Sequence, residues 1–200
     1  RAELDAWKQR AAAAEAAADH DVLTPALNRR GFVAALQRTM AYCQRHGVPA
    51  VLLYLDMDGF KGVNDRLGHA AGDAALVAVA RMLLGHLRES DAVGRLGGDE
   101  FAVLFPGCGT PTCLADAAQL ILDAVRGLIE ADGQTIDPHV TIGGALYGPD
   151  GTDGDALRQN ADFALYHAKE TRRGGFVRFT PDLRTAMLER ARVVRDVDLA

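Results

Sequence analysis

The spacing of hydrophobic residues along the chain predicts helices that alternate with short strands. Apolar residues three and four positions apart form one-sided stripes typical of amphipathic helices. These helices are expected over residues 30–46, 74–87, 111–130 and 156–171. Residues 51–56 are almost wholly apolar, which is typical of a central strand covered on both faces. Further strands are expected at residues 92–96, 100–105, 139–147 and 176–179.

The order of these elements indicates a fold class. Gly97 and Gly98 separate two strands and predict a tight hairpin, because glycine readily adopts the positive φ angles that such turns need. Residues 57–72 are polar and glycine-bearing, so a loop is expected there. The order of the elements predicts an α/β (α+β) fold, with helices flanking a mostly antiparallel central sheet. This order is helix, strand, helix, hairpin, helix, strand, helix and strand.

Both ends of the chain differ from its middle. Residues 1–20 are alanine-rich, and their apolar positions alternate by three and four, which predicts a coiled-coil seam or a plain exposed helix at the end of a longer connecting helix. Residues 181–200 carry a charged helical pattern that predicts a linker. The expected organisation is therefore an N-terminal signalling helix at 1–20, a globular domain at 21–180 and a C-terminal helical linker at 181–200.

Composition narrows the class of protein further. The net charge of −5 argues against broad, nonspecific nucleic-acid binding, which needs a basic face, so no DNA partner is expected. No apolar run reaches the roughly eighteen residues of a membrane span, and residues 1–20 lack the apolar stretch of a secretory signal. Cys43, Cys108 and Cys113 have neither a zinc spacing nor a disulfide framework, so reduced thiols and a cytoplasmic location are expected, with a Cys108–Cys113 pair as the less favoured alternative.

Acidic residues gather at the end of one expected strand and at the hairpin turn. Asp56 ends the buried strand, Asp58 follows two residues later, and Asp99 and Glu100 lie at the turn. Converging carboxylates repel one another unless a cation joins them, and hard oxygen ligands suit magnesium, which usually keeps phosphate oxygens as further ligands. For Asp58 alone, the ordinary preference of aspartate for turns is the favoured interpretation.

The loop expected at 57–72 has the composition of a nucleotide-binding loop. Its glycines and polar side chains are Gly59, Lys61, Gly62, Asn64, Asp65, Gly68, His69, Gly72 and Asp73. Backbone amides of such a loop can bind phosphates with the help of Lys61, while Asn64 and Asp73 offer donors and acceptors for a purine edge. Lys169 and Arg173 share a helical face and suit phosphates, although a solvated basic helix end is the more common reason for such a pair.

The segment Arg95-Leu96-Gly97-Gly98-Asp99-Glu100-Phe101 resembles, letter for letter, the signature of the GGDEF family of diguanylate cyclases. Four other segments agree in order and spacing, so that the resemblance covers about residues 21–180. They are Leu23-Thr24 with Asn28-Arg29-Arg30, the stretch from Leu55 to Asp73, the strand from Thr141 to Ala145, and the helix from Ala161 to Lys169. The resemblance implies a ferredoxin-like, nucleotidyl-cyclase-like fold and a domain excised from a larger signalling protein.

The resemblance also implies an activity, the condensation of two GTP molecules into cyclic di-GMP with release of pyrophosphate. Asp56 and Asp99 would bind two Mg²⁺ ions, or Mn²⁺ in their place, with the carbonyl of Met57 as a further ligand. Glu100 would help to deprotonate the attacking ribose 3′-hydroxyl and is a candidate metal ligand as well. Two metals can stabilise the attacking and leaving oxygens of such an in-line displacement.

Substrate binding follows from the same resemblance. The amides of Gly59, Phe60 and Lys61 would bind the β and γ phosphates, and Lys61 would also stabilise developing charge. Lys169 and Arg173 would complete this phosphate site, although Arg172 and Gly174 depart from the family pattern around Arg173. Asn64 and Asp73 would recognise guanine, with His69 near the nucleoside. Because the Asp73 carboxylate can accept from guanine donors that adenine lacks, GTP is expected rather than ATP.

Regulation and partners complete the expectation. Arg88 and Asp91 form an RxxD pair six residues before Gly97, at the spacing of the family's inhibitory site for cyclic di-GMP. Because each domain binds one GTP, a homodimer is expected, covalently linked to a sensor domain and to an EAL-type phosphodiesterase domain in a longer chain. The alternatives are a noncatalytic module that binds GTP or cyclic di-GMP, a structural dimeriser, and a cyclase that uses ATP.

Overall fold

The computed structural model describes residues 18–131 and 134–186 of the chain. The helix expected at 1–20 therefore lies almost entirely outside the described residues, as does most of the linker expected at 181–200. Residues 181–186 are helical, as that part of the linker pattern predicts. None of the helices in the described ranges combines the length and the apolar character that crossing a bilayer requires.

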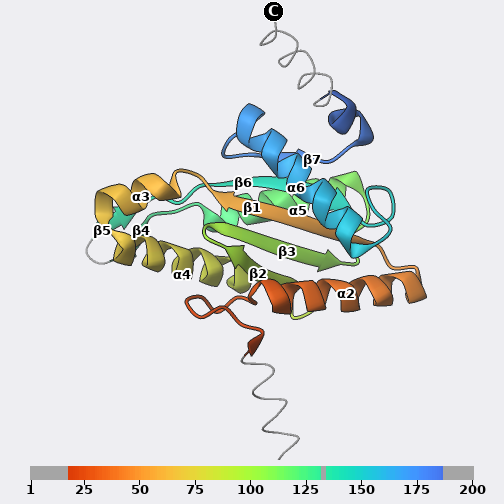
Figure 1. Ribbon diagram of the computed structural model, residues 1–200, viewed down its shortest axis with the longest axis horizontal. Helices are drawn as coiled ribbons and strands as arrows, with labels where there is room; N and C mark the ends of the chain where they lie inside the picture. Colours follow the sequence, from red (N-terminus) through yellow and green to blue (C-terminus); the bar gives the residue numbers. More distant parts are fainter. Residues whose placement is uncertain (1–17, 132–133, 187–200) are drawn as a thin grey trace, which may run out of the picture.

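A five-stranded sheet in the order β2-β3-β1-β6-β7 forms the centre of the fold (Figure 1). Its strands are β1 (Ala50–Met57), β2 (Ala92–Gly97), β3 (Glu100–Pro106), β6 (Val140–Leu146) and β7 (Phe176–Arg178). Every pairing in this sheet is antiparallel except that of β6 with β7, which is parallel. The predicted fold class, helices around a mostly antiparallel sheet, is confirmed.

Two helical layers cover the sheet, one on each face. The helices α2 (Arg29–His46) and α6 (Gly154–Thr171) cover one face, and α4 (His69–Gly85) and α5 (Pro111–Val125) cover the other. Neighbouring residues of β1 point to opposite faces, so Leu52 packs in the core under α2 and α6 while Leu53 packs in the core under α4 and α5. Since both cores are apolar, β1 reads as a continuous hydrophobic run.

The loop expected at 57–72 is largely helical, so that prediction was wrong. Helix α3 (Phe60–Leu67) fills most of it, and α4 already begins at His69 rather than at 74. Gly59 and Gly68 have positive φ angles of 70° and 85°. These glycines end and restart helices at sharp turns, which glycine permits without the strain that a Cβ would bring.

The helix expected at 111–130 ends early, at Val125. Gly127, with φ of 138°, breaks it, and a two-stranded hairpin follows from β4 (Ile129–Ala131) and β5 (Gln134–Ile136). Three-residue strands carry too little periodicity to be recognised in a sequence, whereas the glycine was a readable stop signal.

Cys108 and Cys113 form a disulfide, so the expectation of three reduced thiols was wrong for this pair. The chain turns back directly after β3, because Thr110 caps α5 through Cys113 N–H and Pro111 begins the helix. This turn brings the two Cα atoms to 5.8 Å, within the usual range of a disulfide. Cys43 is a free, buried thiol, and burial raises its pKa.

Helix α6 lies unusually close to β6, and one glycine makes the contact. A Cβ on Gly143 would stand 2.0 Å from the nitrogen of Leu165 and 2.4 Å from the oxygen of Ala161, both backbone atoms of α6. Such distances are impossible for nonbonded atoms, so only glycine allows this approach. The contact sets the height of α6 above the sheet.

Candidate active site

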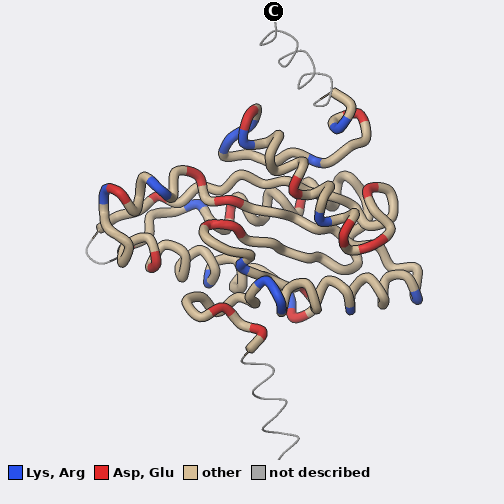
Figure 2. Tube along the Cα trace, viewed as in Figure 1, with Lys and Arg blue, Asp and Glu red and all other residues tan. Residues whose placement is uncertain are grey.

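Two of the acidic residues singled out in the sequence lie opposite each other at the end of the two central strands. Asp56 lies near the end of β1, directly opposite Glu100 on β3. Figure 2 shows acidic segments side by side where β1 ends and the β2–β3 turn begins. Residues directly opposite in an antiparallel pair share a face, so Asp56 and Glu100 both face the side of α2 and α6. The backbone N–H of Met57 donates to the carbonyl of Asp99 at 3.2 Å, which attaches the hairpin turn to the end of β1.

Electrostatics at this point favour a bound cation. Burial raises the pKa of Asp99, and the negative charge of Asp56 raises it further. Lys169 reaches across from α6, and its Nζ lies 2.7 Å from Oδ2 of Asp56. Lys169, which was expected to bind phosphates, thus forms an ion pair with Asp56, a predicted metal ligand.

The donor set fits magnesium in part. Asp56 and Asp99 supply hard oxygens, and they lie near enough for the charge of Asp56 to raise the pKa of Asp99. Mg²⁺ in nucleotide enzymes is commonly held by one or two carboxylates with phosphates and waters as the remaining ligands. Within residues 18–131 and 134–186, no three His, Cys, Asp or Glu side chains converge closely enough to form a complete protein cage. The predicted role of Glu100 as an additional metal ligand therefore stays a prediction.

The N-terminus of α3 offers free backbone donors beside these carboxylates. Gly59 precedes the helix, and no side chain caps the first turn, to which Phe60 and Lys61 belong. The first N–H groups of a helix have no partner within it, and together with the helix dipole they favour an anion. The structure thus brings the three predicted phosphate-binding residues to one helix end.

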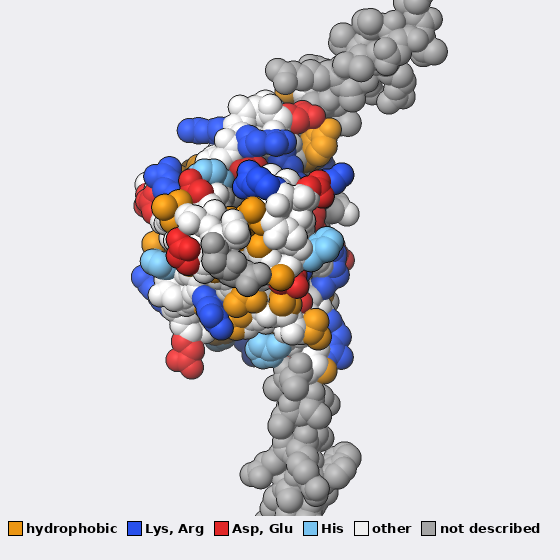
Figure 3. Space-filling view, turned by 90° about the vertical axis from the view of Figure 1, so that its left-hand side faces the viewer, with side chains coloured by type: hydrophobic (Ala, Val, Ile, Leu, Met, Phe, Trp, Pro, Cys, Tyr) orange, Lys and Arg blue, Asp and Glu red, His pale blue; other side chains and the backbone are white. Residues whose placement is uncertain are grey.

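The predicted guanine-binding residues also come together, between α3 and α4. The Oδ1 atom of Asn64 lies so close to Gly72 that a Cβ there would stand 1.9 Å from it. Asp73 follows Gly72 and is exposed, and His69 is the exposed first residue of α4. Figure 3 shows this end of the molecule, where basic, acidic and apolar side chains are interspersed on the visible face.

A contact that the sequence did not suggest connects Asp58 to the end of α6. Thr141 Oγ1 donates to both carboxylate oxygens of Asp58, at 2.8 and 2.9 Å, and it accepts from the N–H of Gly174 at 2.9 Å. The Nε atom of Arg173 lies 3.9 Å from Oδ1 of Asp58. Asp58 is therefore more than a turn residue, and the sequence could not show this because its partners lie far along the chain.

A polar cleft of about 380 Å³ opens beside Glu100, between α2 and α6. The hydroxyl of Tyr54 in this cleft accepts from Nε of Arg158 at 3.2 Å, and burial raises the tyrosine's pKa. Charged residues of the two helices complete the wall: Arg29, Asp155, Arg158 and Asp162. The cleft leaves the Glu100 carboxylate accessible from the side away from α3 and α4.

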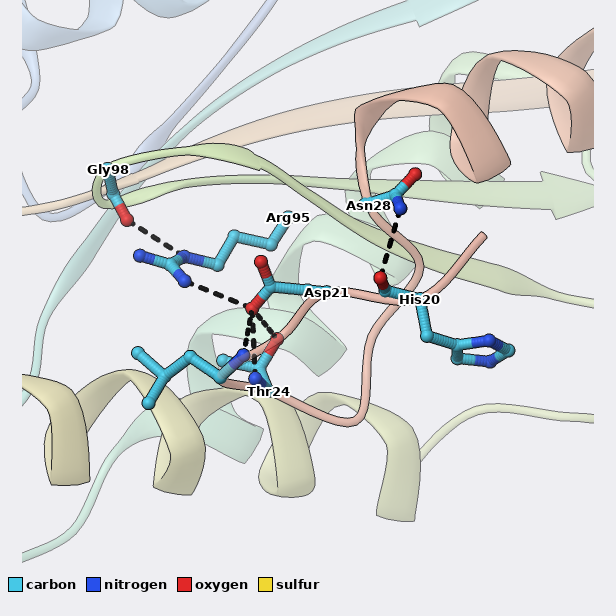
Figure 4. Close-up of polar contacts among 7 residues, drawn as sticks. His20, Asp21, Thr24, Asn28, Arg95 and Gly98 are labelled. Atoms are coloured by element: carbon cyan, nitrogen blue, oxygen red, sulfur yellow. Dashed lines mark hydrogen bonds and ion pairs between the residues drawn. The ribbon is translucent and has the colours of Figure 1, made fainter. Parts of the chain in front are cut away.

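The signature hairpin is held by the turn before α2, as Figure 4 shows. Oδ1 of Asp21 accepts from Nη1 of Arg95 at 3.0 Å and from the backbone and hydroxyl of Thr24, at 2.9 and 2.8 Å. Nε of Arg95 donates to the carbonyl of Gly98 at 3.0 Å. Burial opposes ionisation of Asp21, but these hydrogen bonds outweigh it and lower its pKa. Sequence reasoning assigned neither Asp21 nor Arg95 a role.

The predicted inhibitory residues lie on the rim of a different pocket, of about 310 Å³. Oδ2 of Asp91 accepts from the backbone N–H of Arg88 at 2.9 Å, so the RxxD segment closes on itself as a turn. The Cys108–Cys113 disulfide lines the same pocket. The pair is thus accessible beside a cavity rather than packed along a helix.

Comparison with known proteins gives this arrangement a family. Residues 18–175 match the model of the family described as diguanylate cyclase, GGDEF domain. The chain belongs to the GGDEF family. Its match to diguanylate cyclase TpbB of Pseudomonas aeruginosa is 41% identical over 177 residues, which covers 86% of this chain and 41% of that protein. The chain therefore spans about two fifths of the length of this GGDEF protein.

Solved GGDEF structures share the fold. A structure of TpbB that comprises only the GGDEF domain has a TM-score of 0.80 and 39% identity, and the match covers 84% of this chain and 99% of that one. The coiled coil and GGDEF domain of DgcB from Caulobacter crescentus, in complex with c-di-GMP, has a TM-score of 0.77 and 27% identity, covering 88% and 94%. The family resemblance read from the sequence is confirmed.

Proposed function

We propose that this domain is a diguanylate cyclase that joins two GTP molecules into cyclic di-GMP and releases pyrophosphate. The observation that carries the proposal is the meeting of uncapped amides at the start of α3 with the carboxylates of Asp56 and Asp99, next to Glu100. Amides and Lys61 suit the β and γ phosphates, and we expect the α-phosphate of the same nucleotide to lie near the carboxylates. Membership in the GGDEF family supports the same reaction.

In this proposal each group has one task. Mg²⁺, held by Asp56, Asp99 and the Met57 carbonyl, would neutralise charge on the phosphates and on the attacking oxygen. Glu100 accepts the proton of the incoming ribose 3′-hydroxyl, for which the polar cleft leaves an approach. Lys61, Lys169 and Arg173 bind the departing pyrophosphate.

Guanine selection would come from Asn64 and Asp73. A carboxylate at Asp73 accepts from the ring N–H and amino group of guanine, and adenine would leave it without those donors. His69, at the first position of α4, would contact the nucleoside. We therefore propose GTP rather than ATP as the substrate.

Assembly and regulation extend the proposal. Two domains, each with one GTP, must face each other, so a homodimer is required for turnover. The Arg88–Asp91 turn would bind cyclic di-GMP as an inhibitor, since arginine suits phosphate and aspartate can accept from guanine. The segments at 1–20 and 181–200 would connect the domain to a sensor and to an EAL-type phosphodiesterase.

The test is product formation from GTP and Mg²⁺, followed by chromatography, with Glu100→Gln as the matched variant. The parent should form cyclic di-GMP, and the variant should lose at least about 10²-fold in rate, as expected for a lost general base. A parent that forms no product, even when a fused coiled coil enforces the dimer and bound nucleotide is removed first, would instead support a noncatalytic binding module.

A further inference from the structure

Resting on this proposed function, we infer that Asp58 and Thr141 are positioning residues that hold Arg173 and the α3 loop together around the β and γ phosphates. Asp58 immediately precedes Gly59, the residue that begins the phosphate-binding end of α3. Arg173 lies just beyond α6, on a separate part of the chain. One buried hydroxyl, that of Thr141, connects the two segments.

The geometry of this connection is closed on every side. Thr141 is fully buried, and its hydroxyl donates to Asp58 at 2.8 and 2.9 Å while accepting from the N–H of Gly174 at 2.9 Å. The backbone N–H of Asp58 donates to the carbonyl of His139 at 2.8 Å. The side chain of Asp58 is only 13% exposed, so its charge is poorly screened and its position is well determined.

The same carboxylate also orients the arginine. Nε of Arg173 lies 3.9 Å from Oδ1 of Asp58, while the arginine side chain as a whole is 68% exposed. A guanidinium has five N–H donors, so one edge can face Asp58 while the others remain available for phosphate oxygens. Gly174 has φ of 72°, which makes the turn that keeps the arginine on this side.

The consequence concerns phosphate affinity rather than folding alone. If Thr141 loses its hydroxyl, Asp58 loses a donor and the N–H of Gly174 loses an acceptor, so the Arg173 turn is released from the α3 loop. Binding of the β and γ phosphates should weaken, whereas binding of the nucleoside and α-phosphate should not. If Thr141 had only a structural role, its replacement would weaken binding of all parts of the nucleotide or of none.

The experiment compares Thr141→Val with Thr141→Ser, which restores the hydroxyl. Binding of 3′-deoxy-GTP and 3′-deoxy-GMP with Mg²⁺ is measured by calorimetry, because nucleotides without a 3′-hydroxyl cannot react. Thr141→Val should bind the triphosphate roughly tenfold more weakly, the size expected for one charge-assisted hydrogen bond, with the monophosphate unchanged. Thr141→Ser should bind both nucleotides as the parent does.

Two further variants sharpen the test. Arg173→Ala should show the same selective loss, and combining it with Thr141→Val should add little, because both act through one group. Asp58→Asn keeps shape but removes the charge that faces Arg173, and it should also lower the triphosphate affinity selectively. If Thr141→Val does not fold, Asp58→Asn takes its place in the comparison of triphosphate and monophosphate affinity.

An unchanged ratio of triphosphate to monophosphate affinity in the folded variants would overturn the inference while leaving the proposed function intact. Additive losses in the double variant would also overturn it, because they would mean that Thr141 acts independently of Arg173. A parent protein that binds neither nucleotide would overturn the proposed function, and the inference with it.

Discussion

Replacing Gly143 with alanine should separate α6 from the sheet. A Cβ at this position would stand 2.0 Å from the nitrogen of Leu165, whereas ordinary van der Waals contact begins near 3.4 Å, so the helix must move outward by about 1.4 Å (3.4 minus 2.0). Both clashing atoms belong to backbone, which cannot rotate away. The cost should lie at the upper end of overpacking effects, about 3 kcal/mol.

The same displacement should damage the reaction. Lys169 lies one helical turn beyond Leu165, so it moves with the helix away from Asp56, which its Nζ contacts at 2.7 Å. A misplacement of roughly 1 Å in an active site commonly costs about 10²-fold in rate. We therefore expect Gly143→Ala to lose cyclic di-GMP formation out of proportion to the fraction that unfolds.

Gly144→Ala is the matched control. A Cβ there would face the opposite layer and meet only the methyl ends of Leu53 and Leu114, at 2.9 and 3.1 Å, which can rotate. Its cost should stay below about 1.5 kcal/mol. Urea unfolding of both variants measures the free energy of unfolding. If the two differ by less than about 1 kcal/mol, or if Gly143→Ala keeps parental activity, the argument from close approach is refuted.

Three other perturbations follow from the structure. Asp21→Asn should lower the free energy of unfolding by roughly 2 kcal/mol at neutral pH. Because the pKa of Asp21 is lowered in the folded protein, this deficit should shrink as the pH falls below the usual aspartate range. A deficit in urea unfolding that does not change with pH would contradict this. Cys113→Ser should lower the free energy of unfolding by about 2 kcal/mol, the chain-entropy value for so short a loop, and reducing the parent with a dithiol should have the same effect. Equal stability before and after reduction would argue against the disulfide. Gly72→Ala should displace Asn64 and weaken GTP binding about tenfold, as measured by calorimetry, whereas Gly62→Ala should not, because Gly62 has open space around it. Equal GTP affinities of the two variants would refute the placement of Asn64 beside Gly72.

The sequence predicted the fold class and the main strands because long apolar runs and stripes dominate them. Residues 51–55 are apolar on both faces, and the structure places this strand in the middle of the sheet. It did not predict α3, since eight residues between glycines with a mixed polar composition look like a loop. Nor could it predict the order of the strands, which depends on packing between distant segments.

For the candidate site, the sequence could supply residue types but not their partners. The placement of Asp56 opposite Glu100 agrees with the expected convergence, but it depends on the pairing of β1 with β3, which the β2–β3 hairpin does not determine. The contact of Asp58 with Thr141 joins residues 83 apart, and no local pattern signals it. Likewise, the sequence left a Cys108–Cys113 pair only as the less favoured alternative, because it does not show that the turn capped by Thr110 brings the two cysteines together.

The strand order has a mechanical consequence for Asp56 and Asp99, the two carboxylates predicted to bind metal. Asp56 belongs to the middle strand, with an antiparallel ladder on either side, so a force applied at either edge of the sheet must cross a neighbouring strand to reach it. Asp99 is less protected, because its turn is attached through Arg95 to the segment that enters the domain along the outer edge of β2. A pull or twist on that incoming segment should therefore move Asp99 while Asp56 stays in place. The distance between the carboxylates of Asp56 and Asp99 would then change with the force applied to the incoming segment.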